Sequence, residues 1–268
     1  MRAHYPQSES RDHESTFPAL AVFLLLICAD AGFTLLHLIN VETGWLRGAR
    51  ISLEADGGAA EIFQYLKEFW VAVCMVVAFV STRRAVYVSW ALVFLFLLAD
   101  DSLQLHENAG TWLGDLYAFP APLGLRSKDV GELLFAAVIG LATLIGVGLP
   151  AWRGTEQCRR VSRDLGILVL SLAVVGIVLD VVHVIAYFGR SLLAQVLIVA
   201  EDGGEMIVMS AMTAYAFHIA THMGRTRFDL WPLLKTVANW DVATLWRPVP
   251  AFPRTKLSGT GISPAVND

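Results

Sequence analysis

Carboxylate and imidazole side chains stand at the end of one long apolar stretch of this sequence, in the string from Asp100-Asp101 to His106-Glu107. At about 100° per residue, a continuous helix puts Asp100, Gln104 and Glu107 on one face. His106 then flanks that face, and Asp101 points elsewhere. Such a face is suited to metal binding or proton transfer, because carboxylates and imidazoles do both.

Two further apolar stretches carry pairs of such residues at helical spacing. Asp180 and His183 stand at i and i+3, the spacing by which carboxylate-bridged metal bundles present both ligands inward. Glu201 and Glu205 stand at i and i+4 and therefore share a face. The two glycines between them would let another helix approach closely. Both pairs are candidate ligands for a site of the same kind.

The first two apolar stretches add more ionisable side chains. Asp30 and His37 lie on one helical face at i and i+7, and Glu61 and Glu68 have the same relation beside Lys67. An ionisable group inside a membrane helix costs roughly 2.5 to 3.5 kcal/mol on insertion scales, so it normally faces the bundle interior. These residues are therefore expected to face a common interior.

The composition is that of a membrane protein. Of the 268 residues, 56% are hydrophobic and 16% are charged, and the mean hydropathy is +0.57, far from the usage of a soluble domain. The net charge of -4 includes no basic excess, so we predict no nucleic-acid partner. Cys28, Cys74 and Cys158 are scattered without paired spacing, and we expect neither a disulfide nor a zinc ribbon.

Apolar stretches of about 20 residues predict an all-α, polytopic membrane bundle, because only helices satisfy their own backbone groups one span at a time. Six spans fit: 17–40, 61–81, 85–107, 130–149, 164–187 and 193–222. The predicted organisation is a mobile N-terminal tail (1–16), a six-helix transmembrane domain (17–222) and a cytoplasmic, interfacial and disordered C-terminal tail (223–268).

The distribution of lysine and arginine predicts the orientation. These residues concentrate in the N-terminal tail, the second and fourth connections and the C-terminal tail. Basic residues near span ends are retained on the cytoplasmic side. Both termini are therefore predicted to be cytoplasmic, with the lipid bilayer of the bacterial inner membrane as the partner.

With this orientation, the ionisable side chains reach one common level. Depth follows from position along each span at about 1.5 Å per residue. The acids and histidines lie near the ends of outgoing spans and near the beginnings of incoming spans, and Asp30 lies nearer to the midplane. We therefore predict one polar cavity in the outer half of the bilayer, open to the outside, with Asp30 as its floor.

Crowded carboxylates cannot all stay ionised without counter-charge, so they protonate, pair with a base or bind a cation. Imidazole beside carboxylate suits Zn, Fe, Mn or Cu, and we predict one or two such divalent transition-metal ions. Glu107 is the predicted proton carrier. The predicted metal ligands are His37, Asp100, His106, Asp180, His183, Glu201 and Glu205.

The Asp-Asp-x4-His-Glu string that starts at Asp100, followed downstream by a Glu-rich inner helix, resembles a pattern in bacterial multi-pass membrane proteins without an assigned activity. The resemblance covers mainly the third and sixth predicted spans. It implies a multi-pass membrane fold and no particular reaction.

Ser102-x3-His106 and His218-x3-His222 also resemble signatures of the CREST membrane hydrolases, which include alkaline ceramidases. That resemblance implies one zinc ion shared by both motifs and a fold of seven spans. The predicted topology has six spans and puts His106 on the order of 30 Å from His218. One metal ion cannot bridge that gap, so we set this interpretation aside.

The leading functional hypothesis is a metal-dependent enzyme that acts on a lipid-soluble or periplasmic substrate at the outer leaflet. An alternative is a cation or proton-coupled transporter, although the spans lack polar residues toward the cytoplasm. A further alternative is a structural subunit of a larger membrane complex. A b-type haem is less favoured because these histidines stand beside carboxylates. The sequence predicts neither the substrate nor the oligomeric state.

Overall fold

The computed structural model describes residues 8–44, 50–53, 55, 57–120, 125–179, 181–182 and 192–224. In those ranges all regular structure is helical and no strand is present, which confirms the predicted all-α class. The elements are α1 (Ser8–Thr43), α2 (Ala59–Thr82), α3 (Ala85–Leu103), α4 (Leu105–Tyr117), α5 (Ser127–Arg153), α6 (Glu156–Ala173), the π-helical turn η2 (Val174–Val178) that continues α6, and α8 (Leu192–Thr221).

Five helical segments among the described residues are long and apolar enough to cross a membrane. They are Phe17–Thr43, Ala59–Thr82, Ala85–Leu103, Ser127–Arg153 and Glu156–Val178. The helix α8 has 30 residues and is not among these five segments, and it carries three acids, Glu201, Asp202 and Glu205. The multi-pass character is thus supported for five helices, and a sixth span stays a prediction.

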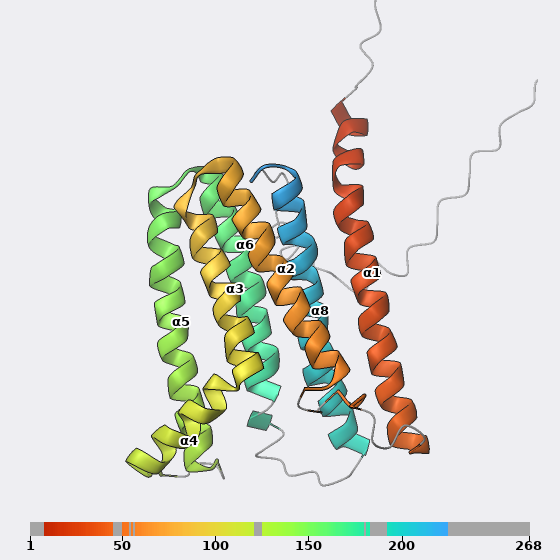
Figure 1. Cartoon of the computed structure of the whole chain (residues 1–268), viewed down its shortest axis with the longest axis vertical. Coiled ribbons are helices and arrows are strands. Elements are labelled where there is room, and N and C mark those ends of the chain that lie inside the picture. The colour runs from red at the N-terminus through yellow and green to blue at the C-terminus, as the bar shows by residue number, and fades with distance from the viewer. Residues whose placement is uncertain are drawn as a thin grey trace, which may run out of the picture. The chain divides into compact units, whose positions relative to one another are not determined.

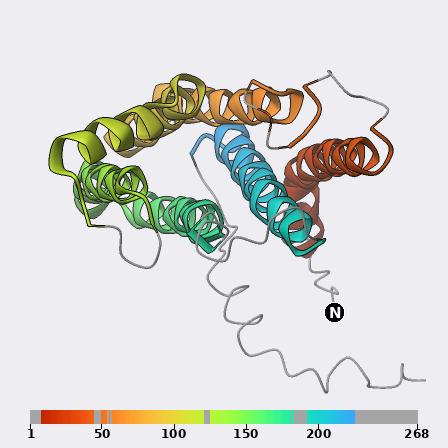
Figure 2. The same ribbon diagram turned by 90° about the horizontal axis from the view of Figure 1, so that it is seen from below.

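Successive long helices run in alternating directions. Figure 1 shows α1, α3 and α6 running one way and α2, α5 and α8 the other, with α4 at the end where α3 finishes and α5 begins. Viewed along the helices (Figure 2), α8 lies next to α1, α2 and α6. The C-terminal end of α3 therefore shares one end of the bundle with the N-terminal ends of α2, α5 and α8.

The apolar core lies toward the opposite end of the bundle. Its largest fully buried side chains come from the first half of α3, the second half of α8 and neighbouring turns of α2 and α6. They include Trp90, Tyr87, Phe94, Met75, Leu165, Met209 and Met212. Close packing at that end holds the helices together and leaves the end near α4 to polar side chains.

The third predicted span, 85–107, is present but ends earlier, because the helix breaks at Gln104. Gln104 has a left-handed backbone (φ 50°, ψ 45°), so α3 ends at Leu103 and α4 begins at Leu105. A break leaves backbone groups without helical partners, and side chains replace them here. Asp100 Oδ1 accepts the His106 N–H at 2.8 Å, and Asn108 Nδ2 donates to the carbonyls before α4.

Glycines bring α4 and α5 into close contact. A Cβ added at Gly131 of α5 would lie 2.4 Å from the Gly110 carbonyl oxygen, and a Cβ at Gly114 would lie 2.9 Å from the Lys128 nitrogen. Real Cβ atoms do not approach backbone so closely, so only glycine fits there. This contact fixes the position of α4, which carries His106.

Gly131→Ala should destabilise the protein by about 1 to 3 kcal/mol, because the added methyl group meets backbone that cannot move aside. The matched control is Gly146→Ala on the same helix, where an added Cβ meets nothing within 4 Å. Alanine is the better helix former, so the control should be as stable as the wild type or more stable. Thermal unfolding in detergent compares the two, and equal midpoints would contradict this packing.

Several other predicted boundaries differ from the structure. The helix α1 begins at Ser8, inside the segment predicted as a mobile tail. The predicted fourth connection shrinks to Gly154 and Thr155, because helix-forming arginines and glutamates extend α5 and α6 toward each other. Asp180 and the segments 183–191 and 225–268 lie outside the described residues.

Candidate metal-binding site

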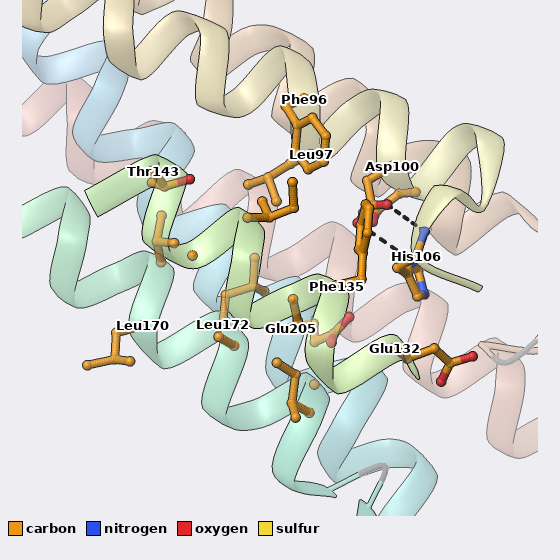
Figure 3. Close-up of a pocket in the computed structure, with 18 of the residues that line it drawn as sticks. Phe96, Leu97, Asp100, His106, Glu132, Phe135, Thr143, Leu170, Leu172 and Glu205 are labelled. Atoms are coloured by element: carbon orange, nitrogen blue, oxygen red, sulfur yellow. Dashed lines mark hydrogen bonds and ion pairs between the residues drawn. The ribbon is translucent and has the colours of Figure 1, made fainter. Parts of the chain in front are cut away.

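The α3–α4 break brings three ligand-bearing side chains together. One ligand atom from each of Asp100, Asp101 and His106 lies within 4.8 Å of the other two. His106 Nδ1 is 3.3 Å from Asp100 Oδ2, and Figure 3 shows the two side chains facing each other. The prediction that Asp101 points elsewhere is wrong, because the break ends the continuous helix on which it depended.

The imidazole of His106 lies in a negative environment. Its hydrogen bond to Asp100 raises the pKa of His106 above its ordinary value, and the charges of Asp100, Asp101 and Glu107 add to the rise, while burial opposes it. The same charges favour any cation at this position, whether a proton on the ring or a metal ion beside it.

Carboxylates from α2 and α8 face the cluster. The buried Glu68 of α2 interacts with Asp101 and with Glu205 of α8. Glu205 in turn interacts with Asp101 and His106, and its Oε1 atom would lie 2.2 Å from a Cβ added at Gly176. Gly176 therefore gives the Glu205 carboxylate room against η2. Three helices contribute acids to one place, and such acids repel one another unless a cation or protons neutralise them.

One of the two glycines next to Glu205 allows the close helix approach that the sequence predicted. A Cβ added at Gly204 would lie 2.8 Å from Val175 Cγ1 of η2, and one at Gly203 would lie 4.0 Å from Thr34 Oγ1 of α1. The predicted close approach is confirmed at Gly204, whereas an added Cβ at Gly203 would make only an ordinary van der Waals contact with α1. This packing lets α8 present its acids between α1 and η2.

Glu61, at the start of α2, already has hydrogen-bond partners within the protein. Its carboxylate accepts hydrogen bonds from the Tyr65 hydroxyl and the Gly57 N–H. The Tyr65 hydroxyl also lies 3.2 Å from the Asp101 carbonyl oxygen. Glu61 therefore anchors the start of α2 beside the cluster and is not a free ligand.

A cavity of about 1210 Å³ opens beside the cluster. Its polar end includes most of the predicted site residues together with Glu68 and Asp101. The rest of its lining is mainly apolar, with Thr143 of α5 and with Ser162 and Arg163 of α6 as polar members. The predicted site residues that line it are Asp100, His106, Glu107, Glu201 and Glu205. The structure thus brings these five around one space, as the common level of the predicted spans implied.

His37 does not line this cavity. It is fully buried on α1, where Nδ1 accepts the Leu53 N–H at 3.2 Å and lies 3.2 Å from Ser52 Oγ. The ring thus holds the connection after α1 against that helix. The predicted ligands Asp180 and His183 lie outside the described residues.

The two histidines of the His-x3-His string lie in the last turn of α8 and just beyond it, more than three turns after Glu205. Their rings are 4.1 Å apart, and His222 Nδ1 lies 2.8 Å from the His218 carbonyl oxygen. Neither lines the cavity. This placement agrees with setting aside one ion shared between these histidines and His106.

Asp30 is not the open floor of the cavity, because it pairs with Lys67. Lys67 Nζ lies 3.0 Å from Asp30 Oδ1 and donates to the Met206 carbonyl at 2.9 Å. Ser210 Oγ donates to Asp30 Oδ2 at 2.5 Å. All the side chains of this ion pair and its serine are buried, and they join α1, α2 and α8. The sequence signal was a lone lysine in an apolar stretch, which requires an acidic partner.

Over the residues that the structure describes, the fold is all-helical, with five apolar, membrane-length helices and a carboxylate–imidazole cluster at one end of the bundle. Residues 19–219 match the family described as a domain of unknown function, DUF8692, and the chain belongs to that family. The matched range contains every residue of the cluster. No curated protein and no solved structure matches the chain.

Proposed function

We propose that this chain is an integral membrane metalloprotein in which Asp100, Asp101 and His106 hold a divalent transition metal. The observation that carries the proposal is that one ligand atom from each of these three residues lies within 4.8 Å of the other two, a spacing that one ion can bridge. Imidazole with carboxylate suits Zn, Fe, Mn or Cu. The donor set fits a cation because Glu68 Oε2 is buried nearby without a hydrogen-bond partner among the described residues.

The carboxylates on α8 extend the proposed ligand set. Glu205 and Glu201 line the same cavity, and Glu205 interacts with both Asp101 and His106. They are suited to complete the coordination of the first ion or to hold a second one. Asp180 and His183 stay in the proposal as predicted ligands from the segment after η2.

We place the site in the outer half of the bacterial inner membrane, with α8 as the sixth span and both termini in the cytoplasm. The distribution of arginine supports this placement. Arg83 and Arg84 lie between α2 and α3, and Arg153 and Arg159 flank the α5–α6 connection, so these groups mark the end opposite the cluster. Basic residues at span ends favour the cytoplasmic side.

The function that this arrangement supports best is metal-dependent catalysis on a lipid-soluble or periplasmic substrate. A bound ion of this class activates water or dioxygen. Glu107 is exposed next to His106 and lines the cavity, so it can take up a proton at its carboxylate and release it to solvent. The Asp100 carboxylate holds His106 in place, because one of its oxygens faces the His106 ring and the other accepts the His106 backbone N–H.

Metal analysis of purified protein tests the proposal. Wild-type protein should contain about one or two equivalents of transition metal, and His106→Ala should lose the ion bound by the cluster. Asp115→Asn is the matched control, because Asp115 is an exposed acid on the same helix and does not line the cavity. Metal-free wild type would contradict the proposal. Cation uptake into liposomes by metal-free wild-type protein would favour the transporter. Protein that neither contains metal nor takes up cations would favour a structural subunit.

A further inference from the structure

Most of the cavity lies beyond the reach of a metal ion. From the cluster it continues between α3, α5 and α6 along apolar side chains. Figure 3 shows Phe96 and Leu97 of α3, Phe135 of α5 and Leu172 of α6 around this space, with Asp100 and His106 at one end of it. The cavity is therefore amphipathic: it is polar at the cluster and mainly apolar along its middle, and Ser162 and Arg163 near the start of α6 also line it.

Glycines keep the apolar part open. Gly140 and Gly148 of α5 and Gly166 of α6 line the cavity, and a Cβ added at any of them meets nothing within 4 Å. No side chain of the described residues fills the space next to these positions. The volume of about 1210 Å³ exceeds the range of about 300 to 1000 Å³ that holds drug-sized ligands.

Water is a poor occupant of the apolar part, because each buried water needs two to four polar partners. Thr143 is the only polar residue that α5 contributes to its part of the lining after Glu132. Hydrocarbon chains satisfy such a surface and surround these helices in a membrane. The helix α5 is also the least buried of the five apolar helices, so a chain can enter beside it from the bilayer.

We propose that this cavity binds one long-chain amphiphile, with its hydrocarbon chain between α3, α5 and α6 and an oxygen-bearing head at Asp100, Asp101 and His106. The placement of the head rests on the proposed metal site, whereas the placement of the chain rests on the apolar lining alone. An alkyl chain and an isoprenoid chain share the required chemistry. The inference names the substrate class as a membrane lipid with a single chain.

Photo-crosslinking tests the chain site. The probe is a long-chain fatty alcohol with a diazirine in mid-chain, added to the full-length protein in lipid nanodiscs, with labelled residues mapped by mass spectrometry. Labels should fall on cavity residues such as Phe96 and Leu172. Two competitors are then added in excess in separate experiments, an unlabelled alkyl alcohol and an unlabelled isoprenoid alcohol. At least one of them should abolish the labelling of the cavity residues. Labelling that neither competitor displaces would overturn the inference.

Two leucine variants make the test specific. Gly140→Leu should fill the cavity without a backbone clash and reduce displaceable labelling several-fold, because its side chain enters the open space. Gly146→Leu adds the same bulk to the same helix at a glycine that does not line the cavity, and it should label like the wild type. Equal labelling of the two variants would also overturn the inference.

Labelling in excess chelator separates the two proposals. Displaceable labelling that persists without metal supports the chain site whatever the metal analysis shows. A metal-loaded protein without displaceable labelling keeps the metal site and overturns the chain site.

Discussion

Lys67→Met should sharply reduce the amount of folded protein in the membrane. The substitution leaves the Asp30 carboxylate buried on α1, with Ser210 as its remaining hydrogen-bond partner among the described residues. Removal of one partner of a buried ion pair typically costs 3 to 5 kcal/mol, a large part of the whole stability of a domain. The Met206 carbonyl loses a donor as well. Gel-filtration yield and thermal unfolding in mild detergent measure the effect.

The double variant Asp30→Leu/Lys67→Met is the control for this prediction. It removes both charges and places apolar side chains of similar size where α1, α2 and α8 meet. Replacement of a whole buried pair is often neutral or stabilising, so the double variant should recover most of the lost yield. If the single variant folds as well as the wild type, this ion pair does not hold α1 to the bundle.

Asp101→Asn should weaken metal binding by about 100-fold or more and yet stabilise the metal-free protein. The first effect follows from loss of a ligand charge. The second follows because the Asp101 carboxylate is repelled by Asp100 and Glu205, and removal of its charge relieves that repulsion. Thermal unfolding with excess chelator and with added zinc reports the two effects separately.

A purely structural Asp101 gives a different pattern. If this carboxylate only supports the α3–α4 break, Asn should lower the unfolding midpoint in chelator, and zinc should shift the wild type and the variant equally. The matched variant Asp115→Asn should change neither midpoint, since Asp115 is exposed on α4 away from the cavity.

The sequence predicted the helical fold and the end of the bundle where the acids gather, because both depend on local pattern. Apolar runs of membrane length can only be helices. Short connections such as Gly154-Thr155 make successive helices antiparallel. Glu201 and Glu205 in the first half of one helix and Asp100 near the end of another then lie toward the same end of the bundle, without any knowledge of side-chain contacts.

The sequence could not predict the details that decide the ligand set, because these depend on contacts between distant residues. The break at Gln104 exists because Asp100 captures the His106 N–H and Asn108 serves the freed carbonyls. A helical wheel assumes one continuous helix and includes no such hydrogen bonds, so it placed Asp101 away from His106. In the same way, Lys67 forms its ion pair with Asp30 of α1 and not with its neighbour Glu68, because α1 packs against α2 at this position.

X-ray absorption at the zinc edge tests the central claim most directly, since it reports the ligands of the bound ion. The zinc-loaded wild type should show imidazole nitrogen at about 2.0 to 2.1 Å together with carboxylate oxygen. In His106→Ala that imidazole contribution should fall or disappear, while Asp115→Asn should keep the wild-type spectrum. An imidazole contribution unchanged in His106→Ala would show that the ion lies elsewhere.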